Sequence, residues 1–165
     1  MKTDTKIVLG AIVASVLIIG GATVVLGNDK SPKRESLGTA TMTIDKTSVD
    51  FGTMRADEER SATFTLTNTS DATLRIWNVA TSCDCTFATV TIGEKSYGEF
   101  NMSMHMGKEL QNWIGEVGAG QTATLSVIYR PKVMPVTGPV TRQVTFATND
   151  PKNPEVEVSV SANVL

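Results

Sequence analysis

Residues 155–164 read EVEVSVSANV and form the most regular stretch of this 165-residue chain. Val156, Val158 and Val160 alternate with polar side chains, so in an extended chain they all point to the same side. Valine also favours strands, because its branched Cβ suits a pleated surface. We therefore predict a half-buried β-strand whose valines face a hydrophobic core.

The same alternation recurs along the chain from residue 40 onward. Three further stretches are long and regular: 61–67 (SATFTLT), 122–129 (TATLSVIY) and 140–148 (VTRQVTFAT). Four shorter ones have the same character: 40–45, 48–54, 73–80 and 87–92. In the 73–80 stretch, the pattern puts Leu74, Ile76 and Asn78 on one face. Trp77 and Val79 are expected on the opposite face.

These stretches follow one another at intervals of about ten residues, which is typical of all-β sandwiches. No segment between them has a convincing helical pattern, and residues 93–96 (GEKS) are expected to be a turn. We predict an immunoglobulin-like antiparallel β-sandwich of about 7–9 strands, formed by residues 39–165. At roughly 125 residues, such a domain is large enough for one hydrophobic core.

Residues 7–27 (IVLGAIVASVLIIGGATVVLG) contain no charged side chain. This apolar run is long enough to cross a hydrocarbon core of about 30 Å as a single helix. A cleaved signal peptide is the alternative, but the run is longer than the apolar region of a usual signal peptide and no clear small-x-small cleavage pattern follows it. We predict a single transmembrane helix at 7–27, after a short tail at 1–6 and before a polar linker at 28–38.

The charges that flank this apolar segment do not decide its orientation, because basic residues stand on both sides. The short tail and the all-β domain that follows favour a domain outside the cytoplasm. The expected location is therefore that of a single-pass membrane protein with a periplasmic or cell-surface domain.

The composition excludes several classes of function. The formal net charge is −2, so there is no basic excess for binding nucleic acid. The sequence has no glycine-rich phosphate loop, no Ser/His/Asp arrangement and no paired catalytic carboxylates. We expect neither nucleic-acid binding nor enzymatic activity, and the sequence does not identify a protein partner.

Four short motifs follow one another along the domain: 49–52 (VDFG), 64–68 (FTLTN), 82–86 (SCDCT) and 146–151 (FATNDP). Together they resemble the bacterial DUF1573 family, whose domains are similar to ASH/MSP-type immunoglobulin-like domains. The resemblance extends over about residues 41–164 and implies the same sandwich. It implies little about mechanism, since the family is named for having no assigned function. The chain departs from shorter family members between residues 87 and 120, where it carries a longer insertion.

Cys83 and Cys85 are the only cysteines in the chain, and Asp84 separates them. On an extended strand their side chains would share one face, with Cβ atoms about 6–7 Å apart. A disulfide needs Cβ atoms about 3.8 Å apart. The pair is therefore better suited to sharing a metal ion than to bonding, unless the backbone is kinked into a loop.

The only histidine, His105, lies in the insertion between Met104 and Met106. Thiolate and thioether sulfur prefer Cu(I), whereas imidazole suits copper or zinc. We predict a metal site formed by Cys83, Cys85 and His105, with Met104 or Met106 as a fourth, weaker ligand. Cu(I) is the first choice of metal and zinc the second. On a strand both methionines would face away from the histidine, whereas a loop would let them converge.

Two other interpretations of the cysteine pair remain open. The thiols are buried and inert in a non-catalytic structural or protein-interaction module, as in many immunoglobulin-like domains. Alternatively, the pair is redox-active, although thioredoxin-like chemistry uses a Cys-x-x-Cys spacing at a helix N-terminus. Free thiols outside the cytoplasm would be liable to oxidation, and this consideration favours a bound metal.

Overall fold

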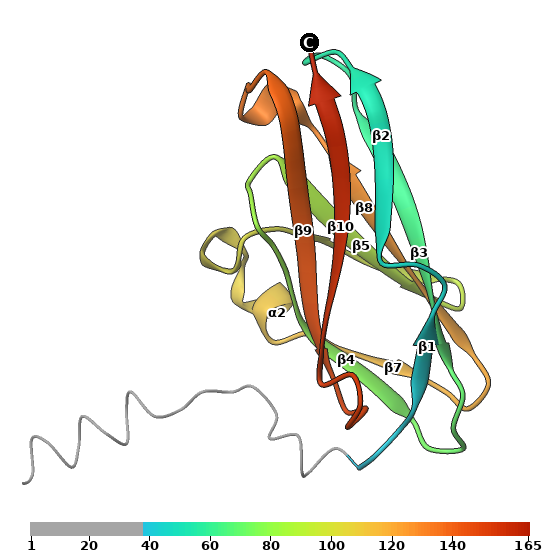
Figure 1. The fold of residues 1–165 in the computed structure, drawn as a ribbon. Helices are drawn as coiled ribbons and strands as arrows, with labels where there is room; N and C mark the ends of the chain where they lie inside the picture. Colours follow the sequence, from blue (N-terminus) through green and yellow to red (C-terminus); the bar gives the residue numbers. More distant parts are fainter. Residues whose placement is uncertain (1–37) are drawn as a thin grey trace, which may run out of the picture. The chain divides into compact units, whose positions relative to one another are not determined.

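The computed structural model describes residues 38–165 of the chain. The predicted tail, transmembrane segment and almost all of the predicted linker therefore lie outside the described residues. Within residues 38–165, no helix is both long enough and apolar enough to cross a membrane. This part of the chain is all-β, as predicted, and its strands form two facing sheets (Figure 1).

One sheet has five strands in the order β1-β3-β8-β5-β6. Their bounds are β1 Met42–Ile44, β3 Arg60–Asn68, β8 Thr122–Tyr129, β5 Thr86–Ile92 and β6 Lys95–Phe100. The other sheet has the order β2-β10-β9-β4-β7. Its bounds are β2 Ser48–Met54, β10 Glu155–Val164, β9 Gly138–Thr148, β4 Leu74–Thr81 and β7 Ile114–Val117. The connections include two 3-10 turns, η2 (Ser103–His105) and η3 (Pro131–Val133), and the short helix α2 (Lys108–Gln111).

The described residues contain ten strands, which exceeds the 7–9 that the sequence predicts. The strands that the sequence did not predict lie in the insertion: β6, which forms a hairpin with β5, and β7, which pairs with β4. Residues 93–96 are not only a turn, because β6 already begins at Lys95, paired with Ile92. Most side chains of β6 are exposed or half-buried. Its sequence therefore lacks the alternation of apolar and polar residues by which a strand can be predicted.

The sandwich contains one parallel strand pair in addition to its antiparallel pairs. β2 runs parallel to β10, whereas β1 pairs antiparallel with β3 in the opposite sheet. Only residues 45–47 separate β1 from β2. The chain therefore crosses from one sheet to the other at this point, and the crossing sets the direction of β2.

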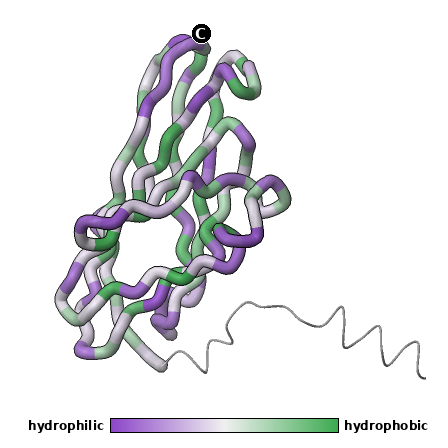
Figure 2. Tube along the Cα trace, turned by 180° about the vertical axis from the view of Figure 1, so that it is seen from behind, coloured by the Kyte–Doolittle hydropathy of each residue, from purple (hydrophilic) through white to green (hydrophobic). Residues whose placement is uncertain are grey.

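The hydrophobic core lies between the two sheets and is filled by alternate side chains from both. Phe64 and Leu125 from one sheet are 0% and 1% exposed, and Val158 from the other is 0% exposed. Val156 and Val160 are also buried, as the alternation in residues 155–164 predicts. Hydrophobic and hydrophilic residues alternate along the trace in the same way (Figure 2).

β4 contains an irregularity that changes which side chains face the core. Between Trp77 and Ala80 the pairing with β9 slips by one residue, and Asn78 has a φ of 53°. A residue in this left-handed conformation at an extra position is a β-bulge. Asn78 is therefore exposed and Val79 is buried, so the predicted faces of these two residues are wrong.

The insertion predicted between residues 87 and 120 includes β6, η2, α2 and β7. Its ends are held together by aromatic packing: the ring of Trp113 lies 5.2 Å from that of Tyr97 and 5.1 Å from that of Phe100. Phe100 is fully buried in the core. The insertion is thus anchored to the sandwich, and it carries η2 toward the turn between β4 and β5.

Candidate functional site around the cysteine pair

Cys83 and Cys85 lie in the turn between β4 and β5 rather than on a strand. The Thr86 amide donates a hydrogen bond to the Cys83 carbonyl at 3.0 Å, which closes the turn. The turn brings the two Cα atoms to 5.3 Å, and the sulfurs form a disulfide. The expectation of an unbonded pair on one face of a strand is therefore wrong, because the bulge and the turn kink the backbone.

Several hydrogen bonds hold this turn in place. The Thr81 hydroxyl donates to the Cys83 carbonyl at 3.0 Å, and the Arg130 amide donates to the Cys85 carbonyl at 2.8 Å. The Asn101 side-chain amide donates to the carbonyls of Asp84 and Thr86 at 3.2 and 2.8 Å. The turn is thus attached to β4, to the end of β8 and to the insertion.

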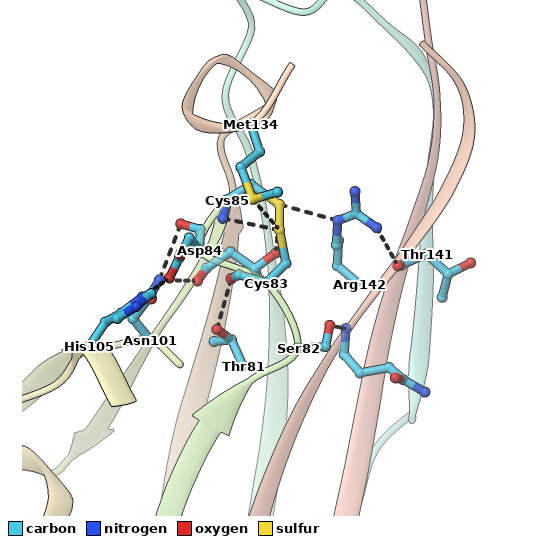
Figure 3. The surroundings of a disulfide bond; sticks show 12 residues. Thr81, Ser82, Cys83, Asp84, Cys85, Asn101, His105, Met134, Thr141 and Arg142 are labelled. Carbon is cyan, nitrogen blue, oxygen red and sulfur yellow. Dashed lines mark hydrogen bonds and ion pairs between the residues drawn. A yellow bond between two sulfur atoms is a disulfide. The ribbon is translucent and has the colours of Figure 1, made fainter. Parts of the chain in front are cut away.

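The two cysteines differ in their exposure to solvent and in the polar partners of their sulfurs. Cys85 is 0% exposed, whereas Cys83 is 9% exposed. The Arg142 Nε on β9 donates to the Cys85 Sγ at 3.2 Å (Figure 3). The Cys83 Sγ accepts a bond from the Cys85 backbone amide, also at 3.2 Å. The sulfur of the fully buried cysteine therefore has a cationic partner, and the sulfur of the more exposed cysteine has a neutral one.

A third sulfur atom adjoins the pair. The Met134 Sδ lies 3.7 Å from the Cys83 Sγ, and Met134 is 48% exposed. Met134 directly follows η3 and stands 51 positions from Cys83 in the chain. Figure 3 shows its side chain directed at the disulfide. Three sulfur atoms thus form one cluster at this end of the sandwich.

The structure does not bring His105 into this cluster. The His105 Nδ1 lies 2.5 Å from the Asp84 Oδ1, and the imidazole is directed at that carboxylate (Figure 3). Met104 is 75% exposed, and Met106 is half-buried against the core. Among the described residues, no group of three His, Cys, Asp or Glu side chains could hold a metal ion.

Arg142 and Met134 are the two residues of this site that the sequence did not single out. Arg142 belongs to a stretch that correctly predicts a strand, but only the pairing of β9 with β4 places it beside Cys85. Met134 lies in a connection between β8 and β9 that has no periodic pattern. No local signal in the sequence distinguishes either residue.

An open groove of about 510 Å³ adjoins the turn on the side of the insertion. Apolar side chains from four segments line it: Phe87, Met106, Leu110 and Val133. Glu99 lies at the same groove and forms a bidentate ion pair with Arg130. The hydrogen bonds from Arg130 lower the pKa of Glu99, so this carboxylate is ionised at neutral pH.

The chain passes back and forth between two facing five-stranded sheets, and this arrangement defines an immunoglobulin-like β-sandwich domain. The family described as "Protein of unknown function (DUF1573)" matches residues 42–111, which include the cysteine turn and η2. This match supports the resemblance that the sequence motifs indicate. No curated protein matches the chain.

Two solved structures with TM-scores above 0.5 support the same fold. A protein of unknown function from Porphyromonas gingivalis W83 has a TM-score of 0.56 and 19% identity over 82% of this chain. The chain spans about half of that protein, 51% of its length. A family 123 glycoside hydrolase from Clostridium perfringens has a TM-score of 0.52 and 7% identity, covering 78% of this chain and 27% of its own. The ASH/PapD-like domain of human CEP192 has a TM-score of 0.49 and 11% identity, covering 77% of this chain and 87% of its own.

Proposed function

We propose that this domain is a non-catalytic module that binds a soft metal ion when its cysteine pair is reduced. Cys83, Cys85 and Met134 are the ligands, Cu(I) is the preferred metal and zinc is the second choice. The observation that carries the proposal is the Met134 thioether, which lies 3.7 Å from the Cys83 Sγ. Two thiolates and a thioether are the donor set that selects Cu(I) over harder ions.

The spacing of the sulfur atoms suits a three-coordinate ion. With metal–sulfur bonds of about 2.3 Å, sulfurs arranged trigonally around one ion lie about 4 Å apart. The distance from Met134 Sδ to Cys83 Sγ is 3.7 Å. Once the disulfide is reduced, rotation of the two cysteine side chains is sufficient to open a similar gap between their sulfurs. Zinc would require a fourth ligand or a water at the same position.

The charges at the site favour a monovalent ion. Two thiolates and one Cu(I) carry a net charge of −1, which the Arg142 guanidinium beside Cys85 neutralises. A buried charge without a partner is costly, so this pairing stabilises the occupied site. A divalent ion would leave a net positive charge among the same groups.

Reduction is compatible with the fold. The disulfide closes a ring over a sequence separation of only two residues. The loss of so short a ring costs on the order of 1–2 kcal/mol of stability. The hydrogen bonds of Thr81, Asn101 and Arg130 to the turn do not involve the sulfurs, so they persist in the reduced state.

The proposed setting is a single-pass membrane protein, with residues 7–27 as the anchor and the sandwich outside the cytoplasm. The uncharged segment at 7–27 and the polar linker at 28–38 support this setting. A tethered metal-binding module outside the cytoplasm would sequester Cu(I) or transfer it at the membrane surface.

The test is a titration of the full-length, detergent-solubilised protein with Cu(I) after reduction, in competition with a chromogenic Cu(I) chelator. The expected result is one ion per chain. Met134→Leu should weaken binding by about tenfold or more, because it removes one of the three proposed sulfur ligands. His105→Gln is the matched control and should bind like the wild type. Wild-type binding no tighter than that of a Cys83→Ser/Cys85→Ser variant would overturn the proposal.

A structural or interaction module with inert cysteines is the second candidate, and one observation favours it. Cys85 is fully buried, and its pair forms a disulfide that closes the turn. In that case the disulfide would resist reduction by millimolar thiols. After forced reduction, the protein would not withdraw Cu(I) from the chelator. The same titration therefore decides between the two candidates.

A further inference from the structure

We propose that the Cys83–Cys85 disulfide undergoes thiol–disulfide exchange with a fixed polarity. A small thiol attacks Cys83, and Cys85 is the leaving group. This reaction would release the two thiolates that the proposed metal site needs, and the inference therefore extends the proposed function. It rests on the same pair of cysteines but does not require metal binding.

Accessibility decides which sulfur is attacked. Cys85 is 0% exposed, and Cys83 is 9% exposed beside the half-exposed side chain of Met134. A thioether side chain has three rotatable bonds, so Met134 can move aside without a change in the backbone. A thiolate from solvent therefore reaches the Cys83 Sγ, whereas the protein shields the Cys85 Sγ.

Electrostatics decide which sulfur leaves. The Arg142 Nε already donates to the Cys85 Sγ at 3.2 Å. When the sulfur–sulfur bond breaks toward Cys85, that contact becomes a charge-assisted hydrogen bond to a thiolate. A thiolate that keeps such a hydrogen bond from a cation is stabilised as it forms and is therefore the better leaving group. The Cys83 Sγ has only neutral neighbours, the Cys85 backbone amide at 3.2 Å and the Met134 thioether at 3.7 Å, so it is the poorer leaving group.

The reaction balances with two equivalents of a low-molecular-weight thiol. The first thiolate donates an electron pair to the Cys83 Sγ and forms a mixed disulfide, while the electrons of the broken bond remain on Cys85 as a thiolate. The second thiolate attacks the external sulfur of the mixed disulfide. It releases a small-molecule disulfide and leaves Cys83 as a thiolate. The thiol is oxidised and the protein is reduced by two electrons.

The polarity is tested on the full-length, detergent-solubilised, metal-free protein with glutathione as the probe. After brief exposure the exchange is quenched with acid and the protein is denatured. Free thiols are then blocked with N-ethylmaleimide, and tandem mass spectrometry locates both adducts. Glutathione is expected on Cys83 and maleimide on Cys85. Glutathione on Cys85, or an equal distribution between the two cysteines, would overturn the proposal.

Single-cysteine variants give an independent reading. In Cys85→Ser the remaining Cys83 thiol should react readily with a chromogenic aromatic disulfide, whereas in Cys83→Ser the Cys85 thiol should react far more slowly. Equal rates in the two folded variants would contradict the shielding of Cys85.

Arg142 is tested by the rate of reduction. Arg142→Met should slow reduction by glutathione about tenfold, because a less stabilised thiolate is a poorer leaving group. Arg142→Lys keeps the charge and should retain most of the rate. An unchanged rate in Arg142→Met, or a rate in Arg142→Lys as low as that of Arg142→Met, would show that the charge of Arg142 plays no part.

The two proposals fail separately. If the protein exchanges with glutathione but binds no Cu(I), the exchange proposal stands and the proposed metal-binding function is refuted. If the protein does not react with glutathione but binds Cu(I) after reduction by a phosphine, the metal-site proposal stands and the exchange proposal is refuted.

Discussion

At the scale of single residues, Asn78 determines how the chain approaches the cysteine turn. Its φ of 53° lies in the left-handed region, which asparagine tolerates better than other residues that have a side chain. The bulge at this position shifts the alternation of β4 by one residue. Val79 and Thr81 consequently face inward, and the turn begins with Cys83 close to the core.

Substitution of Asn78 tests this role. Asn78→Gly should leave the free energy of unfolding nearly unchanged, because glycine adopts the same conformation without strain. Asn78→Val should lower it by about 1–2 kcal/mol, since a β-branched residue is strained there. Denaturant unfolding monitored by circular dichroism would measure both. A valine variant as stable as the wild type would show that the backbone relaxes without cost.

At the scale of elements, the insertion depends on close packing between β7 and Trp113. A Cβ added at Gly115 would lie 2.4 Å from a ring carbon of Trp113 and 2.9 Å from the Ile92 Cδ1. The glycine therefore allows the indole to lie against the β7 backbone. Through Tyr97 and Phe100, this contact holds the insertion, and with it η2, against the sandwich.

Gly115→Ala should displace the indole of Trp113 and destabilise the domain by about 1–3 kcal/mol, as overpacking does. Gly107→Ala is the matched control in the same insertion. No atom lies within 4 Å of its added Cβ, so its stability should be close to that of the wild type. Tryptophan fluorescence during denaturant unfolding would report both changes. Equal destabilisation by the two variants would contradict the specific role of Gly115.

At the scale of the whole molecule, Asp150 connects the two sheets. Its carboxylate lies in the turn between β9 and β10 and accepts a hydrogen bond from the Met42 amide of the opposite sheet at 3.0 Å. Burial alone would raise the pKa of Asp150. Hydrogen bonds from the Asn153 side chain and from the Lys152 and Met42 amides outweigh burial, and the pKa is lowered overall.

The stability of the domain should therefore fall in acid. Because the folded-state pKa of Asp150 lies below the unfolded value of about 3.9, its contribution is present above that pH and is lost as the pH falls through the folded pKa. Asp150→Asn should be less stable at pH 7 and should lose less stability between about pH 5 and pH 2. Thermal unfolding across this range would measure the difference.

A pH profile of Asp150→Asn parallel to that of the wild type would contradict this assignment. The wild-type profile has several contributors, since hydrogen bonds from Thr65, Gly52 and Arg130 also lower the pKa of Asp45, Asp50 and Glu99, respectively. Only the difference between the two profiles isolates Asp150.

The sequence by itself determined the fold class and most of the strands. Alternation with a period of two is a local property, so the stretch 155–164 predicts β10 and its buried valines without knowledge of any partner. The same reasoning predicts β3 and β8. It fails for β6, whose side chains are mostly exposed, and for Asn78, where one extra residue reverses the alternation.

Only the tertiary structure decided how the candidate site is composed. The sequence identified Cys83 and Cys85, but the disulfide depends on a turn that brings their Cα atoms to 5.3 Å. His105 approaches the turn and bonds to Asp84 instead of reaching the sulfurs.

Met134 and Arg142 come from 51 and 57 positions away in the chain. Strand pairing between β4 and β9 and the path of the connection before β9 place them beside the disulfide. Such long-range contacts arise when the two sheets bury their apolar faces together, and no local pattern encodes them.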